Sequence, residues 1–223
     1  MLHDQPQNEC QITNDDDVGR TGTSACSDTG LFFVHIPKTG GGTIEDTICA
    51  RDVRYAGRSA VEAYFNYRGV NRPGSHCLLA EQRLLSVDGL HGARTFSVIR
   101  NPYARFVSEA NFRRTSLEQM MLICQTAQQA DAHDLHAHCR PQVDFVGKRG
   151  ELVDDIFATE EIDGRLLEYL RFHAANPGLV LTSRSHVSTA THAVEDLTEG
   201  QRAWLRSRYA ADFALWEETR GAL

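Results

Sequence analysis

The sequence predicts an α/β protein with a mainly parallel central sheet that helices cover on both faces. Two short runs rich in β-favouring residues, 31–36 and 94–99, read as buried strands, and a helical pattern follows each of them. Such alternation requires crossover connections, which make neighbouring strands parallel and place ligands beyond their carboxyl ends. The 223 residues are enough for one such domain with its own core.

Residues 1–30 predict a flexible tail. They include three consecutive aspartates among Ser, Thr, Gly, Asn and Gln, with too few apolar groups to offset the entropy cost of ordering. No basic segment is followed by an apolar one there, and a run of about 18 apolar residues occurs nowhere. We therefore expect one domain, residues 31–223, in a cytoplasmic protein without a membrane span.

The overall charge and the cysteines narrow the class of protein. Lys and Arg number 23 against 30 Asp and Glu, a net charge of −7, so a broad electrostatic surface for nucleic acid or anionic membrane is not expected. Any anion site must be local. Six cysteines without a C-x-x-C pair favour reduced thiols over a disulfide framework.

The amino-terminal elements are predicted as follows. Pro37 ends the first strand, and Ile44 and Ile48 recur at helical spacing after it, which predicts a helix. Residues 54–75 show no clear period, and residues 78–86 predict a short helix.

The second strand leads into a helix with a clear start. Asn101 suits the N-cap, and Pro102 suits the first helical position. A further helix is expected over 116–130. Residues 131–142 are polar and fit neither period, so we expect a surface loop there.

The carboxyl-terminal part predicts one more strand and two more helices. The strand lies within 151–158 and the first helix within 164–175, ending near the Asn-Pro-Gly sequence that follows. A single amphipathic helix is expected to close the chain, because four apolar residues lie three or four positions apart. They are Leu205, Tyr209, Phe213 and Trp216.

The sequence PKTGGGT connects the first strand to its helix. A strand, a glycine-rich turn and a helix N-terminus present unpaired N–H groups and the positive end of the helix dipole, which favour phosphate. Gly40, Gly41 and Gly42 allow close approach of the backbone, while Lys38 adds a charge and Thr43 a hydroxyl. The nucleotide triphosphate loop requires G-K-[ST], which this chain lacks. A glycine-rich hairpin with a solvated lysine is the alternative for this segment alone.

The sequence FSVIRNPYARFVSEA carries a second candidate phosphate site. Arg100 stands at the exit of the second strand. On the following helix Asn101, Arg105 and Ser108 are spaced by four and three residues and so share one face. A guanidinium and a hydroxyl can thus converge on one phosphate. The alternative is an ordinary capped amphipathic helix with Arg105 on its solvated face.

In this order the two motifs resemble those of sulfotransferases that use 3′-phosphoadenosine 5′-phosphosulfate (PAPS). P-K-T-G-G is similar to the 5′-phosphosulfate loop of the carbohydrate-sulfating branch, which includes the heparan-sulfate 2-O-sulfotransferases and commonly reads IPKTGGTS. R-N-P-Y-x-R-x-x-S is similar to their 3′-phosphate motif. Gly42 stands where that family usually has Thr, and Ala110 replaces its aromatic or small residue.

The resemblance covers residues 31–218 and implies a P-loop-like three-layer α/β/α fold. It implies that Arg100 and Ser108 hold the 3′-phosphate and that the glycine loop holds the 5′-phosphosulfate. The implied cofactor-binding residues are Lys38, Thr39, Gly40, Gly41, Gly42, Thr43, Arg100 and Ser108.

The implied reaction moves a sulfuryl group in line from PAPS to a hydroxyl or amine and leaves adenosine 3′,5′-bisphosphate. Lys38 is the candidate for stabilising charge on the leaving oxygen, and no metal is required. The acceptor proton needs a base, for which a neutral histidine is suited near pH 7. His76 fits best by position between the motifs, His91 is second, and Glu81 is a carboxylate alternative.

Further expectations concern the acceptor, the alternative functions and the remaining histidines. The acceptor is expected to be a glycan or a small metabolite, facing residues 54–75 and 113–142. A P-loop kinase or NTPase and a non-catalytic nucleotide-binding protein on the same fold are the alternative functions. His35 is expected to be a packed strand residue, and His186 a cofactor contact.

One polar cluster matches no standard zinc signature. Its members are His133, His136, His138 and Cys139 with Asp131 and Asp134.

Overall fold

The structure is a computed structural model that describes most of the predicted domain. The described residues are 31–49, 64–67, 70–73, 94–127, 133–173, 176–181 and 191–221. The predicted tail and the helix expected at 78–86 lie outside them.

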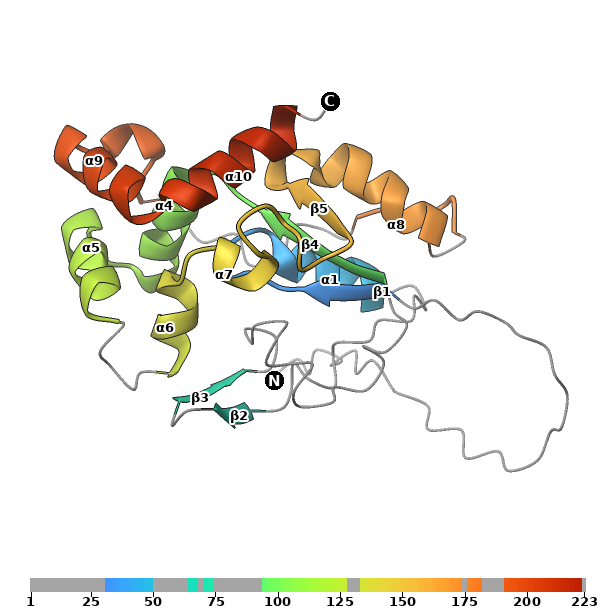
Figure 1. Cartoon of the computed structure of the whole chain (residues 1–223), viewed down its shortest axis with the longest axis horizontal. Coiled ribbons are helices and arrows are strands. Elements are labelled where there is room, and N and C mark those ends of the chain that lie inside the picture. The colour runs from blue at the N-terminus through green and yellow to red at the C-terminus, as the bar shows by residue number, and fades with distance from the viewer. Residues whose placement is uncertain are drawn as a thin grey trace, which may run out of the picture.

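Three parallel strands form the central sheet (Figure 1). They are β1 (Leu31–Val34), β4 (Arg94–Ile99) and β5 (Asp155–Ala158), in the order β1-β4-β5. Phe33 pairs with Phe96, and Ser97 with Ile156. The predicted α/β class with parallel strands is confirmed. The strand at 94–99 is placed as predicted, whereas the first ends two residues early and the last is confined to the final four residues of its predicted range.

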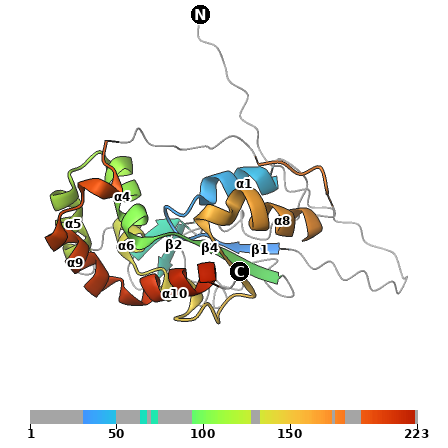
Figure 2. The same ribbon diagram turned by 90° about the horizontal axis from the view of Figure 1, so that it is seen from above.

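Different helices pack on the two faces of the sheet. Successive side chains of β1 point to opposite faces, as the period of a strand requires. Phe32 packs in a cluster with residues of α7 and α10, whereas Phe33 packs with residues of α1 and α8. Figure 2 shows α1 and α8 on one side of the sheet and α10 on the other. The bounds are α1 (Gly41–Cys49), α7 (Val143–Val146), α8 (Leu167–His173) and α10 (Ala210–Gly221).

Four helices surround a further apolar cluster beside the sheet (Figures 1 and 2). They are α4 (Pro102–Arg113), α5 (Leu117–Thr126), α6 (His133–Cys139) and α9 (Glu199–Arg208). The predicted start of α4 is confirmed, because the Asn101 side chain accepts bonds from the N–H groups of Tyr103 and Ala104 at 2.9 and 3.3 Å. Ser116 likewise caps α5, accepting from Gln119 N–H. α5 ends earlier than predicted.

The closing segment is two helices, so the prediction of a single helix was wrong. Tyr209 has φ −112° and ψ 31°, which ends α9 before α10 begins. The two helices pack in different apolar clusters. Leu205 of α9 belongs to the cluster beside the sheet, and Leu215 of α10 belongs to the cluster on one face of the sheet. The break at Tyr209 therefore redirects the chain from one cluster to the other, although the apolar spacing continues through it.

The surface loop expected at 131–142 is also contradicted. Residues 133–139 form α6, and Ala137, His138 and Cys139 are buried. Sequence polarity misled the prediction, because these polar groups find partners in the fold rather than in water.

The region without a clear period contains two short strands that pair with each other. β2 (Tyr64–Tyr67) and β3 (Val70–Pro73) pair antiparallel, with Phe65 opposite Arg72. Short helical turns complete the described elements. They are η2 (Thr159–Glu161), η3 (Ile162–Leu166), which precedes α8 as a π-helical turn, and η4 (Val194–Asp196). Within the described ranges, no helix combines the length and the hydropathy needed to cross a bilayer.

Candidate anion-binding site

Two predicted site segments meet at one edge of the sheet. β1 and β4 are adjacent and parallel, so the chain leaves both strands on the same side. The Arg100 side chain, at the end of β4, donates from Nη1 to the carbonyl of Lys38 in the loop after β1, at 3.2 Å. The fold thus brings a guanidinium and the glycine loop together across 62 residues of sequence.

The loop after β1 is a left-handed turn that needs its glycines. Lys38 has φ 69° and Gly40 has φ 91°, so the backbone alternates in hand. Such alternation turns successive N–H groups toward one side, which forms a concavity suited to an anion. A Cβ atom at Gly40 would lie 2.9 Å from Ile162 Cδ1, and one at Gly41 would lie 2.1 Å from His35 Nε2. A side chain at either position would therefore force the neighbouring side chain to move.

The loop leads directly into a helix N-terminus. α1 begins at Gly41, and its first helical bond runs from the Ile44 N–H to the Gly40 carbonyl at 3.4 Å. The N–H groups of a first helical turn lie before that point, where helices use caps, water or ligands as partners. Together with the helix dipole, they favour a negative charge at this end of α1.

Thr39 has a structural role through its side chain. Its hydroxyl donates to the Ile36 carbonyl at 2.9 Å and is buried. Its own carbonyl accepts a bond from the Thr159 hydroxyl at 3.2 Å, and that hydroxyl also reaches the Ile99 carbonyl at 3.0 Å. Thr159 therefore joins the exits of β1 and β4. The Thr39 backbone N–H is therefore the group that can donate to an anion.

The ammonium of Lys38 lies over the ring of Phe112, 4.0 Å from the ring centroid. The ring is 49% exposed and belongs to α4. A cation–π contact at an exposed site contributes only about 0.5–1 kcal/mol, so a phosphate group can compete for the ammonium. Sequence reasoning missed Phe112, although its position seven residues after Arg105 places both on one face of α4.

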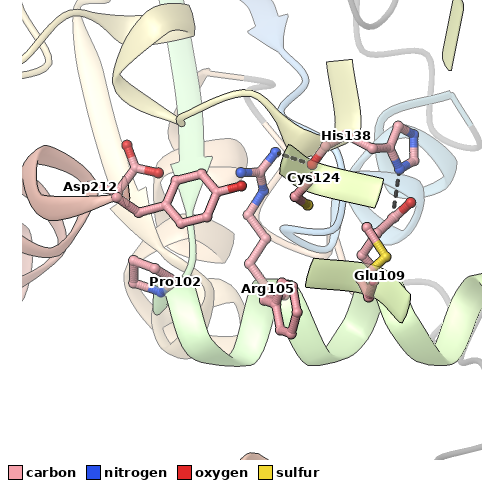
Figure 3. Close-up of a pocket in the computed structure, with 9 residues that line it drawn as sticks. Pro102, Arg105, Glu109, Cys124, His138 and Asp212 are labelled. Carbon is pink, nitrogen blue, oxygen red and sulfur yellow. Dashed lines mark hydrogen bonds and ion pairs between the residues drawn. The ribbon is translucent and has the colours of Figure 1, made fainter. Parts of the chain in front are cut away.

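Arg105 is buried, so the solvated-face alternative for this residue is wrong. Its Nε donates to the Pro37 carbonyl at 2.9 Å. Nη1 and Nη2 donate to the carbonyls of Arg140 and His138 at 2.8 and 3.1 Å. One guanidinium thus joins the glycine loop and the end of α6 to α4. Figure 3 shows Arg105 with its bond to His138.

Ser108 lies between Arg105 and Phe112 on the same face of α4. Arg105 contacts Pro37, and Phe112 contacts Lys38, so this face is directed toward the glycine loop. Ser108 is partly exposed there. The spacing of three and four residues places its hydroxyl on the loop side of the helix.

The backbone of Arg100 is held by two residues that the sequence did not identify. The Gln142 side chain accepts from Arg100 N–H at 2.9 Å and donates to its carbonyl at 2.8 Å. Asp212 in turn accepts from the N–H groups of Gln142 and Val143. Burial raises the pKa of Asp212, against the charge of Arg105 and these two bonds. The partners in these contacts are 42 to 70 residues apart in the sequence, so no local sequence pattern predicts them.

Burial also acts on the Arg100 guanidinium. It lowers the pKa of Arg100 from its ordinary value, and the nearby Glu160 carboxylate opposes that change. An arginine keeps its charge in proteins. The side chain therefore presents a partly desolvated positive charge, which binds an oxyanion more strongly than a fully hydrated one does.

Glu109 and His138 pair with each other beneath the ring of Phe112. Glu109 Oε2 lies 2.6 Å from His138 Nδ1 (Figure 3). The other carboxylate oxygen of Glu109 pairs with Arg113. Burial raises the pKa of Glu109, but the hydrogen bond and charge of His138, with Arg113, lower it more, so the net shift is downward. The His138 ring stacks on Phe112 with centroids 6.1 Å apart.

The remaining predicted residues are placed as follows. His35 follows β1, is half-buried, and stacks on Phe33 with centroids 5.5 Å apart. Thr43 is buried in the first turn of α1. The three candidate bases, His76, His91 and Glu81, lie outside the described residues, as does His186. No group of three possible metal ligands occurs among the residues that the structure describes.

A methyl group at Gly41 tests the geometry of the loop. Gly41→Ala must displace the His35 ring, because the new Cβ would lie 2.1 Å from its Nε2. We expect about tenfold weaker binding of adenosine 3′,5′-bisphosphate, a change of about 1.4 kcal/mol, by calorimetric titration. Gly164→Ala is the matched control, since nothing lies within 4 Å of that Cβ position. Equal affinities of the two variants would contradict the assigned role of the loop.

Comparisons with known proteins found no matching protein-family model, no matching curated protein and no matching solved structure. The chemistry of the site must therefore be judged from its own geometry. That geometry offers a glycine loop at a helix N-terminus with one lysine, and beside it an arginine with a serine on the next helix.

Proposed function

We propose that this protein is a PAPS-dependent sulfotransferase that transfers a sulfuryl group to a hydroxyl or amine of a carbohydrate or small metabolite. The observation that carries the proposal is the contact between Arg100 and the Lys38 carbonyl at the common exit of β1 and β4. It supports two neighbouring anion sites, which one nucleotide with a 5′ and a 3′ phosphate can occupy together. On this proposal the fold is a P-loop-like three-layer α/β/α domain.

In the proposed complex each site takes one end of the nucleotide. The N–H groups of the glycine loop and the first turn of α1 bind the 5′-phosphosulfate, and Lys38 leaves Phe112 to join them. Arg100 and Ser108 bind the 3′-phosphate, for which the forked donors of a guanidinium are suited. These roles follow the resemblance noted for the two motifs.

The proposed reaction is an in-line displacement at sulfur. The acceptor oxygen or nitrogen forms a bond to sulfur while the bond from sulfur to the 5′-phosphate oxygen breaks. The acceptor proton passes to a base, for which His76 is our first candidate, and the negative charge on the leaving phosphate is stabilised by Lys38. The products are the sulfated acceptor and adenosine 3′,5′-bisphosphate.

Nucleotide preference separates this proposal from the kinase or NTPase alternative. We expect adenosine 3′,5′-bisphosphate to bind with micromolar affinity and to raise the melting temperature, and Mg-ATP to bind more weakly. Isothermal titration of both ligands on the full chain measures the difference. Tighter binding of Mg-ATP, or no heat and no thermal shift with the bisphosphate, would overturn the proposal.

A second measurement separates catalysis from binding alone. His76→Ala should reduce sulfate transfer by about 10²–10⁴-fold and leave bisphosphate affinity unchanged, since a general base contributes to rate rather than to cofactor binding. Mass spectrometry of cell extracts incubated with labelled PAPS identifies the acceptor for the assay. Intact cofactor binding without transfer to any acceptor class would favour a non-catalytic nucleotide-binding protein instead.

A further inference from the structure

We infer that Cys124 and Cys139 form an intramolecular disulfide that joins α5 to α6. Their Sγ atoms lie 2.9 Å apart, and both side chains are buried as free thiols. A disulfide bond has a sulfur–sulfur distance of about 2.05 Å, so closing this pair requires a small movement. The inference does not depend on the proposed function.

Packing fixes the positions of the two sulfurs. Cys124 belongs to the apolar cluster beside the sheet, together with Met120 of its own helix. The Cys139 carbonyl accepts a bond from the Tyr209 hydroxyl at 2.9 Å. Its two neighbours in sequence offer their carbonyls to Arg105. Figure 3 shows Cys124 and Arg105 among the residues that line the pocket between these helices.

These fixed surroundings distinguish the pair from surface thiols that meet by chance. The backbone of α6 is held on both sides of Cys139, and Cys124 sits in a helix with a capped start. The two thiols therefore face each other as a result of the fold. The sequence did not indicate this, because the cysteines are 15 residues apart and form no C-x-x-C motif.

Thiol–disulfide exchange with a small-molecule disulfide, such as oxidised glutathione, supplies the oxidation. Either cysteine can attack first with the same products. When Cys124 attacks first, it does so as the thiolate, which is the nucleophilic form of the group. Its thiolate displaces one glutathione thiolate and forms a mixed disulfide. Cys139 then loses its proton, attacks Cys124 Sγ and displaces the second glutathione. Two thiols and one glutathione disulfide give one protein disulfide and two glutathione thiols.

The burial of both sulfurs determines when this exchange occurs. Exchange requires access to the thiols, so we expect it to be fast during folding and slow once α5 and α6 are packed. Once formed, the bond should resist mild reductants for the same reason. It would also restrain the end of α6, where the carbonyls of His138 and of the following Arg140 accept bonds from the Arg105 side chain that also bonds to the glycine loop.

The experiment uses the full chain with the other four cysteines changed to serine. The changed positions are Cys10, Cys26, Cys49 and Cys77. The protein is unfolded, reduced and refolded in a buffer of oxidised and reduced glutathione. We expect a monomer that is lighter than the reduced chain by about 2 Da and takes up no maleimide after unfolding. Its melting temperature should exceed that of the reduced form by roughly 5–10 °C.

Two comparisons complete the test. Cys124→Ala in the same background should take up one maleimide and show no thermal shift on oxidation. Peptide mapping of the oxidised wild-type chain provides the same answer if the serine variant does not fold, through a linked pair of peptides containing Cys124 and Cys139. A reduced monomer, a stable mixed disulfide with glutathione, or a dimer linked between chains would overturn the inference.

Discussion

Arg100→Ala is expected to weaken the binding of adenosine 3′,5′-bisphosphate by about 30- to 100-fold, or about 2–3 kcal/mol. The guanidinium is partly buried beside the glycine loop, where a charge-assisted bond to phosphate is screened less than on the surface. The backbone at this position is held by Gln142, so the side chain can be removed without releasing the end of β4. Isothermal titration at two salt concentrations measures the loss.

The same variant should change which nucleotide the protein prefers. If Arg100 binds the 3′-phosphate, Arg100→Ala should weaken the bisphosphate far more than adenosine 5′-phosphate, which lacks that group. Lys38→Ala should weaken both nucleotides about equally, since Lys38 is assigned to the 5′ end. Equal losses for both ligands in Arg100→Ala would show that the two ends of the nucleotide are assigned wrongly.

Arg94→Ala is the matched control for charge. It removes an arginine from the opposite end of the same strand, where Arg94 pairs with Asp155. The two positions are six residues apart along the strand, or roughly 20 Å, which is beyond the screening length at physiological salt. Affinity for the bisphosphate should therefore be unchanged. A loss comparable to that of Arg100→Ala would indicate a non-specific charge effect.

Arg105→Ala is expected to lower the free energy of unfolding by about 3–4 kcal/mol. The guanidinium is buried and donates to the carbonyls of Pro37, His138 and Arg140, so its removal leaves three acceptors without these bonds and opens a cavity. For a chain of this length, such a loss lowers the melting temperature by about 10 °C. Urea denaturation followed by tryptophan fluorescence gives the free energy.

Arg105→Lys distinguishes lost charge from lost geometry. A lysine keeps the charge, but its single ammonium cannot serve three carbonyls that come from two different segments. We therefore expect it to recover only a minor part of the stability. Arg206→Ala is the control, because Arg206 is exposed and donates to the Tyr103 hydroxyl at 2.6 Å. An Arg105→Ala variant as stable as the control would refute the role of Arg105 as the residue that fastens the loop.

Local patterns predicted the elements that carry the candidate site. The apolar run before PKTGGGT, the Asn101 cap and the Pro102 start each depend on neighbours in sequence, and the structure places a strand or a helix at each. Parallel pairing followed from the alternation of strands and helices. The order of the two motifs was therefore enough to expect them at one edge of a sheet.

Contacts between distant segments decided what local patterns could not. The end of the segment 133–139 is buried in the fold although the segment is polar in sequence, because Glu109 and Arg105 supply partners for the imidazole and the carbonyl of His138. The closing helix breaks at Tyr209 because its two halves pack in different clusters. In both cases the deciding energy comes from groups far apart in the chain.

By itself the sequence determined the α/β class, the glycine loop and the arginine at the end of the second strand, because each depends on backbone conformation within a few residues. Only the tertiary structure decided that Arg105 is buried beneath the loop, that Phe112 receives the Lys38 ammonium, and that the thiols of α5 and α6 meet. The physical reason is that burial and pairing of a side chain are fixed by the elements packed against it, and those elements are not its neighbours in sequence.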